Sequence, residues 1–203
     1  LAPYIQLAEK LGSFLAQVAG GISRLRVTYS GALMDWKTGP ITTSILKGML
    51  ERIMDDHVNL VNADYLARRR GVKVETVHRG NGDDYHNRIG VEAETAEGQV
   101  TVAGSVFQPD SPRIVEINGY RVDAVPTGYM LVAPHQDRPG IIGKVGTMLG
   151  EAGINIATMQ VGRKKQGGPA VMVLGTDAPL PPAVLDAICE IPGIYGAKQV
   201  VLL

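Results

Sequence analysis

The chain has 203 residues, of which 45% are hydrophobic, and its 20 lysines and arginines balance its 20 aspartates and glutamates. This composition excludes a disordered chain, and a net charge of zero provides no overall field for a nucleic acid or an anionic membrane. No apolar run reaches the roughly 20 residues that a membrane span needs, and the lone Cys189 cannot form an internal disulfide. We therefore expect one large or two small globular domains in a reducing cytoplasm.

The first segment, residues 1–21, has apolar side chains at helical spacing and ends at Gly20-Gly21. Because Glu9 and Lys10 lie inside this apolar pattern, the segment is predicted to be a helix and not a signal peptide. The chain lacks an initiating methionine, so we expect it to begin inside a longer protein. Residues 23–31 then alternate apolar and polar side chains, as a half-buried strand does.

Two further helices are predicted before the chain changes its periodicity. Residues 38–56 open with Thr-Gly-Pro and place apolar side chains on one helical face. Residues 59–71 have Asn62 as the expected N-cap and Gly71 as the expected end. The three arginines before Gly71 suit a helix C-terminus, and anion binding is the alternative interpretation.

From Val72 the apolar period becomes two, which predicts a run of strands. The expected strands are residues 72–78, 87–99, 100–107, 112–117 and 120–125. Asn118-Gly119 is a strong hairpin signal, because a type I′ turn needs positive φ at both central residues, and Glu97-Gly98 is a weaker one. We predict an α+β domain over residues 1–126, with an antiparallel sheet that carries helices on one face.

The turn-forming residues Pro126-Thr127-Gly128 predict a domain boundary. Residues 127–203 predict a second, ferredoxin-like domain. Its expected elements follow the order β-α-β-β-α-β and are residues 129–134, 139–153, 155–163, 169–176, 181–191 and 198–203. Pro139 is expected at the first helical position, with Asp137 or Arg138 as the cap.

One stretch of this second domain, HQDRPGIIGKVGTMLGEAGIN, combines polar residues with a predicted helix N-terminus. His135, Asp137 and the backbone N–H groups of Gly140 and Ile141 are expected to surround that N-terminus. Its dipole and its free donors favour a carboxylate or another anion. These residues are therefore candidates for a ligand site.

Asn155 stands at the far end of the same stretch, where the next strand begins. We expect the two ends of the stretch to meet in space, so that Asn155 adds an amide that both donates and accepts. Gln136, between the first two candidates, is expected to face the opposite way. Such a mixture of donors and acceptors suits a small zwitterion.

Other chemistry has little support in the sequence. The glycines at 140, 143 and 146 lack the G-x-G-x-x-G order of a dinucleotide loop, and Gly143 and Gly146 are expected to let helix and sheet approach closely. His57, His78 and His86 lack metal-ligand spacing, and no nucleophile and base are paired. We predict neither a metal site nor a catalytic residue in this chain.

The quoted stretch, continued as IATMQVGR, resembles the ACT domain, a small regulatory module that binds amino acids, often between two copies. The preceding LAEKLGSFLAQVAGG, NLVNADYLARRRGVKV and PRIVEINGYRVDAVP resemble the C-terminal region of long-form D-3-phosphoglycerate dehydrogenases of serine biosynthesis. The resemblance implies an intervening domain (residues 1–126), also called the allosteric substrate-binding domain, followed by an ACT domain (residues 127–203). The family's catalytic histidine, substrate arginine and Rossmann glycine loop have no counterpart here.

The resemblance also implies a function. L-serine would bind at His135, Asp137 and Asn155 and exert feedback control through a homo-oligomer, a dimer in the simplest case, that forms through the ACT domain. A catalytic domain that uses NAD would precede this region in the same polypeptide, and this chain itself would hold no cofactor. A stand-alone amino-acid sensor, or a subunit of an L-serine dehydratase with an ACT domain, is the alternative.

Some relatives are expected to bind an anionic, substrate-like ligand in the intervening domain through basic residues. Arg88, Arg113 and Arg121 flank predicted turns and strand starts and could converge on a phosphate. The alternative is that they are exposed arginines on a half-solvated sheet.

Overall fold

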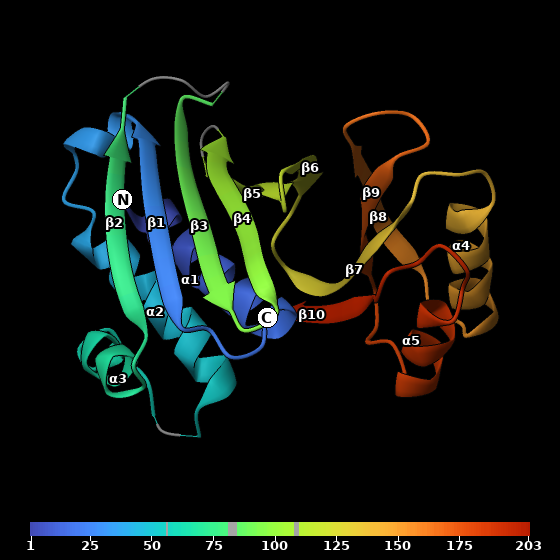
Figure 1. The fold of residues 1–203 in the computed structure, drawn as a ribbon, viewed down its shortest axis with the longest axis horizontal. Coiled ribbons are helices and arrows are strands. Elements are labelled where there is room, and N and C mark those ends of the chain that lie inside the picture. Colours follow the sequence, from blue (N-terminus) through green and yellow to red (C-terminus); the bar gives the residue numbers. More distant parts are fainter. Residues whose placement is uncertain (56, 81–84, 108–109) are drawn as a thin grey trace. The chain divides into compact units, whose positions relative to one another are not determined.

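The computed structural model describes the whole chain except residues 56, 81–84 and 108–109 (Figure 1). Contacts within the chain divide it into two compact units, Leu1–Gly119 and Tyr120–Leu203.

The first unit combines α-helices with a sheet. Its helices are α1 (Ala2–Val18), the 3₁₀ helix η1 (Ala32–Asp35), α2 (Gly39–Ile53) and α3 (Ala63–Arg69). Its strands are β1 (Arg24–Gly31), β2 (Lys73–Arg79), β3 (Asn87–Thr95), β4 (Gly98–Phe107) and β5 (Ser111–Ile117). The strands of this unit lie in the order β2-β1-β3-β4-β5.

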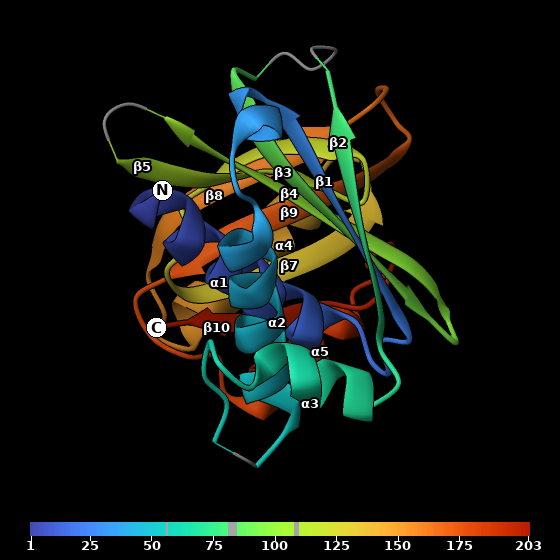
Figure 2. The same ribbon diagram turned by 90° about the vertical axis from the view of Figure 1, so that its left-hand side faces the viewer.

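Helices α1 and α2 lie behind the strands in Figure 1, and α3 packs against α2, as Figure 2 also shows. The sheet side chains alternate accordingly: Leu25, Val27 and Tyr29 of β1 are fully buried, whereas Arg26 and Thr28 between them are partly exposed. One face of the sheet therefore carries the core and the other faces solvent, which confirms the predicted α+β class.

The crossing of α1 and α2 depends on two glycines. A Cβ on Gly12 would lie 1.9 Å from the backbone oxygen of Ile45, and a Cβ on Gly48 would lie 2.0 Å from the backbone oxygen of Glu9. Real side chains do not approach this closely, so only glycine permits the two helix backbones to touch here. Leu11 of α1 and Met49 of α2, which adjoin these glycines in the sequence, are fully buried.

The structure corrects one prediction about the sheet. We expected the strands from Val72 onward to form an antiparallel run, but β2 pairs in parallel with β1, from Arg24 opposite Lys73 to Ser30 opposite Arg79. The physical reason is that α2 and α3 form a crossover between the two strands, and such a crossover returns the chain in the same direction. Strands β1, β3, β4 and β5 are antiparallel neighbours, as predicted.

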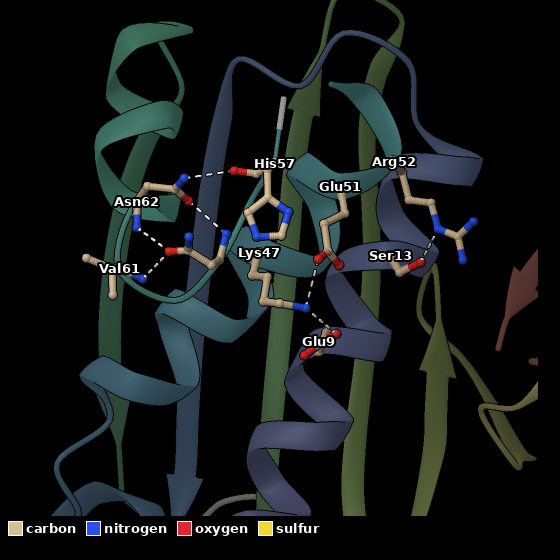
Figure 3. A network of polar contacts seen from close by, with 9 residues as sticks. Glu9, Ser13, Lys47, Glu51, Arg52, His57, Val61 and Asn62 are labelled. Atoms are coloured by element: carbon tan, nitrogen blue, oxygen red, sulfur yellow. Dashed lines mark hydrogen bonds and ion pairs between the residues drawn. The ribbon is translucent and has the colours of Figure 1, made fainter. Parts of the chain in front are cut away.

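Polar side chains connect segments of the first unit (Figure 3). Lys47 of α2 lies between Glu9 of α1 at 2.7 Å and Glu51 at 2.9 Å. Asn62 precedes α3, as predicted, but its side chain does not cap the helix: its Oδ1 accepts from the Asn59 N–H, and its Nδ2 donates to the His57 carbonyl. The side chain stabilises the turn before the helix instead.

The predicted turn at Asn118-Gly119 has the expected backbone. The φ angles of the two residues are 48° and 77°, which a type I′ turn requires. The N–H of Asn118 donates to the carbonyl of Thr101, and the side-chain oxygen of Asn118 accepts from the Thr101 N–H, both at 2.9 Å. Asn118 therefore bonds both the N–H and the carbonyl of Thr101 in β4, and it also forms the turn.

The second unit has the predicted ferredoxin-like order after a first short strand, β6 (Tyr120–Ala124). The elements that follow are β7 (Gly128–Gln136), α4 (Ile141–Glu151), β8 (Ile156–Arg163), β9 (Pro169–Thr176), α5 (Pro182–Cys189) and β10 (Lys198–Leu202). The sheet order is β10-β7-β9-β8, and all neighbours are antiparallel. Helices and sheet share one core that contains Leu131, Val145, Leu149, Met172 and Ile188.

Two predictions about α4 are wrong. The helix begins at Ile141, not at Pro139, because Gly140 adopts a φ of 90°, a left-handed conformation that breaks the helix; neither Asp137 nor Arg138 caps it. Gly143 and Gly146 do not bring helix and sheet together, since a Cβ on either would meet no atom within 4 Å. The core face of α4 is formed by its buried apolar residues, spaced by four, and the two glycines lie outside it.

Candidate functional site

A pocket lies where the loop after β7, the N-terminus of α4 and the β8–β9 turn meet. Its lining residues are Gln136, Asp137, Arg138, Pro139, Gly140, Ile142, Arg163, Gln166 and Gly167. The first N–H groups of a helix have no partner inside the helix, so the start of α4 provides donors and a positive dipole end here. Ile141 itself is buried in the core, and Gly140 forms the wall beside the pocket.

Asp137 is the acidic group of this pocket. Its Oδ2 accepts from Arg163 Nη1 at 2.7 Å and from the Gly167 N–H at 3.1 Å, and its own N–H donates to the Gly168 carbonyl at 2.8 Å. The bond from Arg163 lowers the pKa of the Asp137 carboxyl, and the Gly167 N–H lowers it further. Asp137 is therefore a fixed negative charge next to a helix N-terminus.

His135 and Gln136 exchange the places that the sequence predicted for them. His135 is only 1% exposed, and its Nδ1 lies 3.1 Å from the carbonyl oxygen of Ala133, so the ring does not line the pocket. The side chain of Gln136 lies in the pocket wall, where its Nε2 donates to the Gly167 carbonyl and its Oε1 accepts from Tyr195 Oη at 2.8 Å. Strand β7 ends at Gln136, so the alternation of its side chains between the two faces of the sheet does not extend to Asp137.

Asn155 lies at the opposite end of the sheet from the pocket. Its Nδ2 donates to Asp177 Oδ2 at 2.7 Å, and β8 starts beside Thr176. The pocket end is marked by Ala170, which pairs with both His135 and Arg163. The length of β8, about 23 Å at about 3.3 Å per residue, separates the two ends. The prediction that the two ends of the stretch meet in space is wrong within one chain, because α4 returns the chain to the opposite end of the sheet, where β8 begins.

The three arginines suggested for an anion have different surroundings. Arg88 Nη2 lies 3.1 Å from Glu116 Oε2 and shares a depression on the open sheet face with Arg26 and Arg79. Arg113 donates to the carbonyl of Pro112 at 3.1 Å and is not part of that depression. Arg121 belongs to β6 in the other unit. The anion site stays a prediction.

Carboxylates accompany the arginines of this depression. Arg26 lies 3.2 Å from Glu75 and 3.3 Å from Glu92, so the positive charge of Arg26 is paired. Arg26 was not among the predicted site residues, although the alternating pattern of β1 already placed it on the polar face. The mixed charges indicate a solvated, ion-paired surface.

Arg163 and Gly167 are the functional candidates that sequence reasoning missed. They lie about 30 residues after Asp137 in the chain, and only the β8–β9 hairpin brings them to it. The signal that could have found them is the turn KKQGG, whose paired glycines predict a tight hairpin directly after Arg163.

Within the described ranges, no group of three or more His, Cys, Asp or Glu side chains is arranged to hold a metal ion. The glycine-containing turn before α4 does not fit a dinucleotide, because β7 has only antiparallel neighbours and the dinucleotide fold needs parallel strands. No helix among the described residues has the length and apolarity to span a membrane.

Comparison with known families matches both units. Residues 1–118 match the family model of the D-3-phosphoglycerate dehydrogenase intervening domain, and residues 130–193 match the ACT domain. The predicted domain ranges, 1–126 and 127–203, stay a prediction at their boundary, since the two matches leave residues 119–129 between them.

Three similar proteins share the same name. The chain is 41% identical to D-3-phosphoglycerate dehydrogenase of Methanocaldococcus jannaschii over 96% of its own length and 37% of that protein's. It is 38% identical to the protein of that name from Synechocystis, over 100% of this chain and 37% of the relative. For the Bacillus subtilis protein of that name the identity is 36%, over 98% and 38%. The chain thus spans less than two fifths of these relatives.

Proposed function

Because the chain belongs to the D-3-phosphoglycerate dehydrogenase intervening-domain family and carries an ACT domain, we propose that it is the regulatory region of such a dehydrogenase and binds L-serine. The observation that carries the proposal is the pocket at the N-terminus of α4, with the fixed charge of Asp137 beside it. The intervening-domain match favours this function over a stand-alone sensor or a dehydratase subunit.

The pocket offers complementary groups for both charges of an amino acid. The carboxylate of Asp137 suits the ligand's ammonium, and the N–H groups at the start of α4 suit its carboxylate. The pocket also contains the amide side chain of Gln166, which can bond a hydroxyl. A small zwitterion with a hydroxyl therefore fits the chemistry of the walls.

The position of Asn155 supports a site shared between two copies of the chain. Strand β8 is an edge strand of its sheet, and its side chains Met159 and Val161 are 49% and 37% exposed. If β8 pairs antiparallel with its symmetry mate, the start of one β8 lies beside the end of the other. Asn155 of the partner subunit would then reach the pocket that contains Asp137. Within one subunit, Asn155 and the pocket lie at opposite ends of the sheet.

Serine would act through this pairing. A ligand held between two subunits stabilises one arrangement of the pair, and it shifts the population only if it binds the two arrangements unequally. The reaction with NAD would belong to the part of the relatives that this chain does not cover, and the regulatory region would control it in the same polypeptide. The predicted cytoplasmic location is part of the same proposal.

Mixed dimers test the shared site. We would prepare Asp137→Ala and Asn155→Ala separately, unfold and refold them together in equal amounts, and titrate each sample with L-serine by calorimetry. Each variant alone should bind at least about tenfold more weakly, because a hydrogen bond to a charged group is lost. In the mixed dimer, one pocket combines both alanines and the other has both native residues, so some sites should bind as tightly as wild type.

The wild-type protein, refolded in the same way, is the control for the procedure. If Asn155 served the pocket of its own chain, every pocket in the mixture would keep one defect and no tight site would return. Absence of serine binding in the wild type would reject the proposed ligand outright. A lowered melting temperature of Asn155→Ala with unchanged serine affinity would make its bond to Asp177 purely structural.

A further inference from the structure

We propose that Arg163 is a positioning residue of the ligand pocket: it holds one oxygen of Asp137 so that the other oxygen faces the ligand's ammonium. This inference rests on the proposed amino-acid site. It assigns to the β8–β9 hairpin a part in ligand selection, because Arg163 ends β8 and Gly167 lies in the turn that follows.

The contacts to Asp137 are uneven between its two oxygens. Both bonds that the described residues give to its carboxylate, from Arg163 Nη1 and from the Gly167 N–H, end on Oδ2. A carboxylate can accept at both oxygens. The arrangement therefore fixes the plane of the group and leaves Oδ1 as the oxygen that can accept from a ligand.

The hairpin that carries Arg163 is itself fastened to the loop before α4. The Asp137 N–H donates to the Gly168 carbonyl, and the Gln136 amide donates to the Gly167 carbonyl. Gln136 is in turn bonded by Tyr195. The loop before α4, which carries Asp137, is thus bonded to the β8–β9 hairpin by backbone and amide groups. Among these contacts, the Arg163 side chain is the only charged donor to Asp137.

The surroundings predict what happens when Arg163 is removed. Among the groups around the Asp137 carboxylate, Arg163 bonds it directly and has the largest effect on its pKa. Without Arg163 the carboxylate loses its strongest donor. Its pKa should rise toward the ordinary range of an aspartate, and its orientation should become variable.

The test compares Arg163→Ala, Arg163→Lys and, as a matched control, Lys165→Ala, which removes a positive charge from the same hairpin outside the pocket lining. L-serine affinity is measured by calorimetry near neutral pH. The titration of the Asp137 carboxyl carbon is followed by NMR in the same samples, whose amide spectra report whether the domain is folded.

We expect Arg163→Ala to bind serine about tenfold to a hundredfold more weakly and to show a higher midpoint for Asp137. Arg163→Lys should recover most of the affinity, because lysine also donates to Oδ2, and Lys165→Ala should behave as wild type. An affinity within twofold of wild type in a folded Arg163→Ala, or an unchanged Asp137 midpoint, would overturn the proposal.

The two proposals fail in different ways. If the wild-type protein does not bind serine, the proposed function fails, and the Asp137 midpoint alone then decides whether Arg163 positions that carboxylate. If the alanine variant does not fold, the lysine variant decides: a midpoint and affinity close to wild type support the role, and a loss as large as that of Asp137→Ala contradicts it.

Discussion

Helices α1 and α2 of the first unit approach so closely that a Cβ on Gly12 or Gly48 would collide with a backbone oxygen. A Cβ on Gly143 or Gly146 of α4, in contrast, would meet no atom within 4 Å. The same residue thus serves close packing in one unit and leaves a helix surface open in the other. Glycine spacing along the chain does not distinguish the two uses, because the difference depends on what lies opposite the helix.

The pairing of charged side chains also differs between the two units. On the open sheet face of the first unit, Arg88 pairs with Glu116, and Arg26 pairs with two glutamates. In the second unit, both bonds to Asp137 from described residues reach one of its oxygens, beside a pocket. Charges that satisfy one another stabilise a surface, and a charge with an oxygen to spare can receive a ligand.

The largest effect should come from Gly12→Ala. The new methyl group would lie 1.9 Å from the Ile45 oxygen, so α1 and α2 would have to separate and lose packing along their contact. We expect the free energy of unfolding to fall by about 3 kcal/mol or more, measured by urea denaturation.

The matched substitution, Gly143→Ala, should instead raise the free energy of unfolding by about 0.5 to 1 kcal/mol, because alanine favours the helix and its methyl group meets open space. Equal losses from the two substitutions would break the comparison, since they would show that α4 also needs its glycine for packing.

An effect smaller than that of Gly12→Ala concerns Tyr29, which is fully buried in the first unit and whose hydroxyl bonds Thr42 at 2.7 Å. Burial raises the pKa of Tyr29 to about 12. The folded state therefore holds the proton more tightly than the unfolded state. Its contribution is complete below the unfolded pKa, about 10, and is lost as the pH rises toward the folded one.

We expect the free energy of unfolding to be about 1.4 kcal/mol lower near pH 11 than near pH 8 on account of this group. Urea denaturation of wild type and Tyr29→Phe across that range isolates it, because the other titrating groups are common to both proteins. Identical slopes for the two proteins would show that the Tyr29 hydroxyl reaches solvent in the folded state.

The smallest effect should follow Arg88→Met. Its pair with Glu116 is partly exposed, and pairs of this kind contribute about 0.2 to 1 kcal/mol. Urea denaturation at low and high salt should show a small loss that salt reduces. If the wild type binds phosphate and the folded variant does not, Arg88 belongs to the predicted anion site. That result would weaken the contrast with Asp137.

Much of the fold follows from local patterns. The alternation of β1, the ferredoxin-like order of the second unit and the Asn118-Gly119 turn were predicted because period and turn chemistry are local. The parallel pairing of β2 was missed, since period two is the same for both strand directions. The start of α4 was missed because it depends on one φ angle, at Gly140.

The candidate site was only partly predictable for the same reason. Asp137 lies in the pocket, as its place before a helix suggested, but the inward turn of His135 follows from how β7 packs. The separation of Asn155 from the pocket depends on the register of β8 against β9. Arg163 reaches Asp137 across a hairpin, and contacts between distant parts of a chain leave no periodic signal.

The crossover that makes β2 parallel to β1 also has a consequence for the order of events in folding. β2 closes a loop of more than 40 residues after β1, contacts one strand of the sheet at its edge, and is exposed along nearly its whole length. Such a strand gains few contacts for the chain entropy that its docking costs. Its backbone amides should therefore exchange with solvent deuterium through local opening, well before those of β1, whose amides wait for the whole unit to unfold.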